Sequence, residues 1–160
     1  MNQLREIVLG AAIVGLGAMF GTGLYESIAN APNFTSGIPS SLEHARSFWK
    51  VSNPGHFFRV AAPATQLATL LALILSWNRP RGRRIWLVTA FLLIAAADVV
   101  TYAIHIPRNQ LMFTNPLTAS PEALQRAAEE WGDWNWVRVV LALLAATAAL
   151  IAFSKREAVA

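Results

Sequence analysis

The sequence predicts an all-α integral membrane protein, a single domain over residues 1–160 that forms a bundle of four transmembrane helices. Hydrophobic residues make up 55% of the chain and charged residues 14%, and the mean hydropathy of +0.42 is too high for an ordinary soluble domain. The apolar residues gather into four runs, each near the roughly 20 residues that cross a bilayer core. Arginines concentrate between the second and third runs. Together these observations indicate a multi-pass membrane protein.

The four predicted spans differ in how many polar residues they contain. We place them at residues 7–26, 57–77, 85–106 and 134–153. The first has no charge before Glu26, and the second has only uncharged polar guests from Val60 onward. The third contains Asp98 and His105, and the fourth contains Arg138. Because an ionisable group in hydrocarbon costs about 3 kcal/mol or more, each of these needs a partner or a cavity.

The arginines predict that both termini are cytoplasmic. The segment Asn78–Arg84 holds four arginines, and short cytoplasmic loops are enriched in such residues. Arg5 before the first span and Lys155 and Arg156 after the last fall on the same side. We expect a bacterial inner membrane location with membrane lipids as partners. The isoelectric point near 10.3 does not predict a nucleic-acid partner, since the charges sit at membrane borders.

Two longer connections are predicted to form an outer cap on the side opposite the arginines. They cover residues 27–55 and 107–133. The first should open as irregular loop and then form a short amphipathic helix over Leu42–Trp49, capped by Ser40 or Ser41. Pro107 should kink or end the third span near Ile106. In the second connection Ser120 caps a helix that reaches Trp131 and leads into the fourth span.

Polar side chains recur at helical spacing near the outer ends of the spans. Asp98, Tyr102, His105 and Asn109 stand at i, i+4, i+7 and i+11, and we expect this stripe to face protein. Shorter stripes run from His56 through Arg59 and Pro63 to Gln66, from Trp131 through Asn135 to Arg138, and from Thr22 to Glu26. If they converge, one outer pocket is lined by Glu26, His56, Arg59, Tyr102, His105, Asn109, Trp134 and Arg138, above a floor at Asp98. An aromatic belt and a structural ion pair of Arg138 with Glu26 or Asp98 explain part of this pattern equally well.

Four short motifs resemble one family of small membrane proteins. They are Gly23–Glu26, Ser52–Gly55, Tyr102-x-x-His105-Ile106-Pro107-Arg108-Asn109 and Trp134-x-x-x-Arg138. Over most of its length the chain is similar to the four-helix DUF1772, or anthrone oxygenase-like, proteins. The resemblance implies oxygenation of the central carbon of an anthrone to give an anthraquinone, although many bacterial members have no assigned role. It also implies a site containing His105, Asn109, Trp134 and Arg138, with Glu26 and Tyr25 contributing.

That chemistry sets requirements for the site. An anthrone is a flat carbon acid, so its oxidation needs a base, donors for the enolate oxygen and an apolar slot. His105 or Glu26 is the predicted base, and Arg138 with Asn109 would hold the oxyanion. The predicted substrate-binding residues are Tyr25, Tyr102, Trp134, Phe57, Phe58 and Asp98. An electron-rich enolate can react with dioxygen without a metal, so the cofactor stays open between none and a metal or haem.

Two alternatives remain at the level of sequence. His56, His105 and Glu26 could ligate a metal or haem iron, although no paired metal-binding motif lies on one helix and the chain has no cysteine. The bundle could also be a non-catalytic lipid- or quinone-binding protein, or an accessory subunit of a larger membrane complex. A homo-oligomer is compatible with each interpretation.

Overall fold

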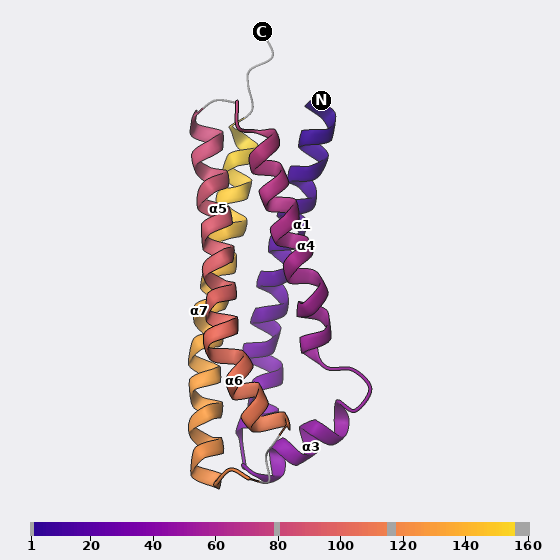
Figure 1. The fold of residues 1–160 in the computed structure, drawn as a ribbon, viewed down its shortest axis with the longest axis vertical. Coiled ribbons are helices and arrows are strands. Elements are labelled where there is room, and N and C mark those ends of the chain that lie inside the picture. The colour runs from indigo at the N-terminus through magenta and orange to yellow at the C-terminus, as the bar shows by residue number, and fades with distance from the viewer. Residues whose placement is uncertain (1, 79–80, 115–117, 156–160) are drawn as a thin grey trace.

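The fold is seen in a computed structural model, which describes residues 2–78, 81–114 and 118–155. Within those residues, four helical stretches are long and apolar enough to cross a membrane. They stand side by side in an elongated bundle, and α1 begins at the same end at which α7 finishes (Figure 1). The predicted membrane helical bundle is therefore confirmed. The cytoplasmic placement of the termini stays a prediction, and Arg79 and Arg156 lie outside the described residues.

The helices are more continuous than the sequence suggested. In chain order they are α1 (Asn2–Tyr25), η1 (Glu26–Asn30), α2 (Ala31–Thr35), α3 (Ser40–Phe48), α4 (Pro54–Leu75), α5 (Arg81–Val100), η2 (Thr101–His105), α6 (Ile106–Asn109), η3 (Gln110–Thr114) and α7 (Pro121–Ser154), where η marks a π-helical turn. α7 has 34 residues and is therefore about 50 Å long, well beyond a hydrocarbon core of roughly 30 Å. α4 has 22 residues, about 33 Å. The other three helical stretches, Gln3–Thr35, Arg81–Phe113 and Pro121–Ser154, are longer than α4 and extend beyond the predicted membrane.

Two prolines in the predicted connections, Pro32 and Pro107, lie inside helices. Pro32 and Pro107 each follow a π-helical turn by two residues, and the helix continues through both. In the wider turn the backbone N–H of Ala31 bonds to Glu26 and that of Ile106 to Thr101, five residues back. This register change makes room for a ring that would clash within a regular α-helix. The prediction of an irregular loop after Glu26 was therefore wrong, and the third span does not end near Ile106. Its other predicted form, a kink, agrees with the change of direction at α6 (Figure 1).

The outer cap has a hydrophobic core of its own. Phe34 of α2 is 2% exposed and makes edge-to-face contacts with Trp49, Phe113 and Trp131, at ring-centroid distances of 5.9, 5.5 and 5.2 Å. These four rings bring together α2, the end of α3, η3 and the first part of α7. Trp131 is therefore a core residue of the cap, whereas its sequence position near a predicted membrane border favoured an aromatic belt.

The helix starts in the cap agree in part with the sequence. Ser120 Oγ accepts a hydrogen bond from the Ala123 backbone N–H at 3.3 Å, and α7 continues unbroken into the fourth span as predicted. The amphipathic helix is present as α3. Ser40 and Ser41 do not cap it, because the residue before the helix is Pro39 and both serines lie within the first turn. Their hydroxyls instead donate to the backbone oxygens of Gly37 and Phe34.

Small residues allow the spans to approach closely. α5 and α7 pack through buried alanines, among them Ala90, Ala97, Ala145 and Ala149. α1 crosses α4 at Gly15, where a Cβ atom would sit 2.6 Å from Oγ1 of the buried Thr65. The close α1–α4 crossing thus depends on glycine at this position.

Replacing Gly15 by alanine is expected to destabilise the bundle by about 1–3 kcal/mol, because the added methyl group forces the two helices apart. Thermal unfolding in detergent measures the change. Gly17→Ala is the matched control, since a Cβ there meets nothing within 4 Å and alanine favours the helix. Equal melting temperatures for the two variants would show that the crossing tolerates a side chain.

Candidate functional site

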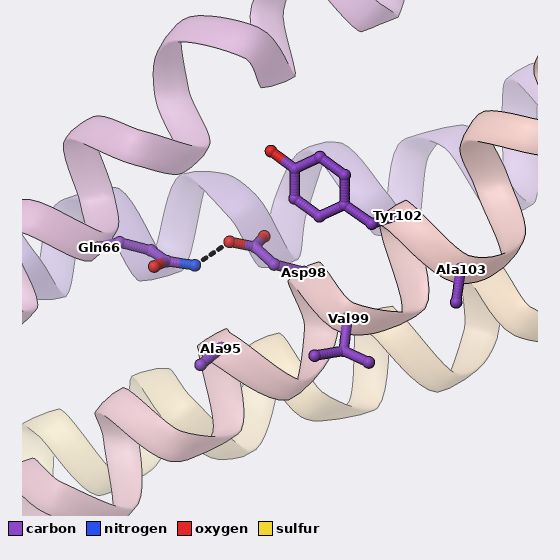
Figure 2. A pocket seen from close by; sticks show the side chains of 6 residues that line it. All are labelled: Gln66, Ala95, Asp98, Val99, Tyr102 and Ala103. Atoms are coloured by element: carbon purple, nitrogen blue, oxygen red, sulfur yellow. Dashed lines mark hydrogen bonds between the residues drawn. The ribbon is translucent and has the colours of Figure 1, made fainter.

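A groove between α4 and α5 holds an ionisable side chain at membrane depth. It is an open cavity of ≈ 490 Å³ lined by Gln66, Ala95, Asp98, Val99, Tyr102 and Ala103. Figure 2 shows these side chains, with Gln66 on one helix facing Asp98 on the other. The amide of Gln66 donates a hydrogen bond to Asp98 Oδ2. The groove therefore has a mainly apolar wall and one carboxylate, which Gln66 of the facing helix orients.

A small interior cavity lies on the other side of Asp98. It has a volume of ≈ 10 Å³, about the space of one water molecule, and is lined by Asp98, Arg138 and otherwise apolar residues. Arg138 interacts electrostatically with both Asp98 and Glu26. Its guanidinium also lies 5.1 Å from the ring centroid of Phe58, in a cation–π contact. The Arg138 guanidinium thus offsets the charge of two carboxylates in the bundle interior.

Hydrogen bonds extend this network to the first span. Arg138 donates to Asn135 Oδ1 at 3.1 Å, and Asn135 Nδ2 donates to Ser27 Oγ at 2.8 Å and to the Gly23 carbonyl at 3.2 Å. Asn135 is 1% exposed, so these bonds form in a low-dielectric interior where an unpaired polar group would be costly. The polar network therefore crosses the bundle from Gln66 on α4 to the end of α1.

Glu26 lies at the far end of the network from the groove. Both of its carboxylate oxygens accept hydrogen bonds from Asn30 Nδ2, at 3.0 and 2.9 Å, across the π-helical turn η1. Glu26 is buried, and its other partner is the electrostatic contact with Arg138. Glu26 therefore belongs to the same polar network as Arg138, but its side chain does not line the groove.

The predicted stripe of the third span divides between two environments. Tyr102 is 71% exposed at the groove, whereas His105 is 2% exposed and packs edge-to-face on Trp131, with ring centroids 5.1 Å apart. The backbones of Val100 and Trp131 lie near the imidazole. Within the described residues, however, neither ring nitrogen meets the distance and angle criteria for a hydrogen bond. Tyr102 and His105 both lie in the π-helical turn η2, where the wider i→i+5 turn changes the angular spacing of side chains from that of an α-helix.

The remaining predicted residues are spread along the outer half of the bundle. Phe57 packs against Phe58 with ring centroids 5.4 Å apart, at the entry of α4. His56 is exposed beside Ser52, at 3.2 Å from Nδ1 to Oγ. Tyr25 and Trp134 are exposed, and Asn109 is half-buried in α6. None of these side chains lines the groove described above.

The proposed metal ligands do not come together. Within residues 2–78, 81–114 and 118–155, no group of three His, Cys, Asp or Glu side chains is arranged to hold a metal ion. His56, His105 and Glu26 therefore do not form a three-ligand metal site in the described part of the chain.

Gln66 and Asn135 belong to the site but were not among the predicted site residues. Both stand on polar stripes in the sequence, one at i+10 from His56 and the other three residues before Arg138. Their spacing was therefore a usable signal. An uncharged amide in an apolar helix is a weaker signal than a charge, because it costs less to bury.

Comparison with known proteins finds one family whose model covers most of the residues of this site. A family model described as anthrone oxygenase matches residues 54–148, more than half of the chain. The matched region contains Gln66, Asp98, Tyr102 and Arg138, and it does not include α1 with Glu26. No curated protein and no solved structure matches the chain.

Proposed function

The chain belongs to the anthrone oxygenase family, and from that premise we propose that it oxidises a flat aromatic carbon acid with dioxygen in the groove between α4 and α5. The observation that carries the proposal is Asp98, a carboxylate at the floor of an open groove that is otherwise mainly apolar. Val99 and Tyr102 at the groove are 66% and 71% exposed, so an apolar substrate would reach it from the lipid.

The proposed reaction begins with a proton transfer. Asp98 removes a proton from the CH₂ group that is conjugated to the ring carbonyl, and the electron pair moves into the enolate. The enolate carbon then forms a bond to dioxygen and gives a peroxide, which takes up a proton. Loss of the second C–H proton and cleavage of the O–O bond release water and leave a carbonyl group. One substrate and one dioxygen give one quinone and one water.

Other residues of the network would support this base. Gln66 orients the carboxylate from across the groove through its hydrogen bond to Asp98. Arg138 lies behind Asp98 and offsets its charge, so the carboxylate need not be buried alone. Tyr102 lies at the groove with its hydroxyl available to donate to the enolate oxygen. Gln66 and Arg138 are positioning residues here, whereas Asp98 and Tyr102 would touch the substrate.

The bases predicted from sequence alone are less well placed for this role. Glu26 is held by Asn30 on the far side of Arg138, and His105 packs in the outer cap against Trp131. The proposal therefore assigns the proton transfer to Asp98, and it leaves Glu26 the role of second counter-charge to Arg138.

Oxygen uptake tests the proposal directly. The purified protein in lipid nanodiscs would be mixed with anthrone, while an oxygen electrode records uptake and absorbance records the quinone. We expect equal molar amounts of oxygen consumed and quinone formed, above the rate with empty nanodiscs. Binding of anthrone without oxygen uptake would instead support the non-catalytic binding protein.

Filling the groove should block the reaction. Ala95→Phe is expected to lower kcat/KM by at least about tenfold, because the ring occupies the wall of the groove and displaces the substrate from Asp98. Ala96→Phe is the matched control, since this exposed neighbour does not line the groove. Equal losses in the two variants would mean that the groove is not the site.

A further inference from the structure

The arginine-rich end of the bundle, opposite the cap, contains a buried ion cluster. Glu6 of α1 accepts hydrogen bonds from Arg5 at 3.1 Å and from Arg83 of α5 at 2.8 Å. The Arg83 side chain is only 3% exposed, and its Nε has no hydrogen-bond partner within the described part of the chain. This cluster ties α1 to the start of α5 and leaves one buried cationic donor unused.

The first turn of α5 carries an excess of positive charge. Arg81, Arg83 and Arg84 all lie in this turn, which has no acidic residue. Cations are unfavourable at a helix N-terminus, where backbone N–H groups already carry partial positive charge. Across residues 2–78, 81–114 and 118–155, Glu6 is the one carboxylate at this end of the bundle. Among the described residues, positive charge therefore exceeds negative charge at this end of the bundle.

One of these cations, Arg84, contacts an exposed aromatic side chain. The Arg84 guanidinium lies 5.2 Å from the ring centroid of Trp77 and donates to the Trp77 carbonyl at 3.4 Å. Trp77 is 53% exposed, and Ile74 of α4 and Ile85 of α5 are also exposed. An anion that binds here would therefore meet both arginines and an adjoining apolar surface.

We propose that this end of the bundle binds the phosphate of an anionic phospholipid, with Arg81 and Arg84 as its cationic contacts. The lipid phosphate would supply the negative charge that the first turn of α5 lacks, and the positive end of the helix dipole would add to the attraction. The acyl chains would lie along Ile74, Trp77 and Ile85. The adjoining apolar surface favours a lipid over a free phosphate ion, because only a lipid uses both parts of the site.

Native mass spectrometry of the detergent-purified protein tests this proposal. Phosphatidylglycerol and phosphatidylcholine with the same acyl chains would be titrated, and the bound fraction of each measured. We expect a preference for phosphatidylglycerol that declines as salt concentration rises. Arg81→Gln should weaken phosphatidylglycerol binding by roughly fivefold, and Arg81→Gln/Arg84→Gln by roughly 30-fold.

The matched control removes two exposed or half-exposed arginines from the opposite end. Arg46→Gln/Arg126→Gln changes the net charge by the same amount within the cap and should leave the lipid preference unchanged. Thermal melting of all variants establishes that they are folded. Equal binding of the two lipids, an equal loss in the control, or protection from melting by inorganic phosphate alone as large as that by phosphatidylglycerol would overturn the proposal.

Discussion

Asp98→Asn is expected to lower the rate of oxygen uptake with anthrone by at least about 100-fold, because an amide cannot accept the proton that starts the reaction. The substitution nearly preserves the shape of the side chain, and the amide oxygen can still accept the hydrogen bond from Gln66. Binding of the substrate should therefore change much less than kcat. Oxygen-electrode kinetics and a separate anthrone-binding titration measure the two effects.

Asp133→Asn is the matched control for this experiment. Asp133 is exposed on α7 and does not line the groove, so the same chemical change there should leave uptake unaffected. Glu26→Gln and His105→Gln test the two bases that the sequence suggested. If Asp98→Asn retained full activity while one of these variants lost it, the proton transfer would belong to the polar network or to the cap rather than to the groove.

The largest expected effect on stability comes from the cap. Phe34→Ala should destabilise the folded protein by about 3–5 kcal/mol, because it leaves a cavity among Trp49, Phe113 and Trp131. Thermal unfolding followed by tryptophan fluorescence suits this region, since two of the three neighbouring rings are tryptophans. A lower melting temperature with retained helical circular dichroism would indicate that the cap melts before the spans.

Phe48→Ala provides the comparison for the cap. Phe48 lies on α3 and is 84% exposed, so its removal should change stability by no more than about 0.5 kcal/mol. A small effect of Phe34→Ala, close to that of Phe48→Ala, would contradict the interpretation of the cap as a packed hydrophobic core.

Much of the candidate site was visible in the sequence because charges in apolar runs are rare. Asp98 and Arg138 stand out within their spans, and Tyr102 lies one helical turn from Asp98. The structure places Asp98 and Tyr102 at the groove with Arg138 behind them. His105 separated from this group because η2 changes the helical register, and no residue type in Thr101–His105 marks that change.

The sequence by itself determined the class of fold, because the length of apolar runs and the position of arginines are local properties that a bilayer selects directly. It also determined the Ser120 cap of α7, which depends on residues only three apart. Only the tertiary structure decided that Gln66 meets Asp98, 32 residues away, and that Asn135 reaches Ser27, 108 residues away. Those pairings depend on how each helix is rotated about its axis, which is fixed by close packing at small residues and by π-helical turns.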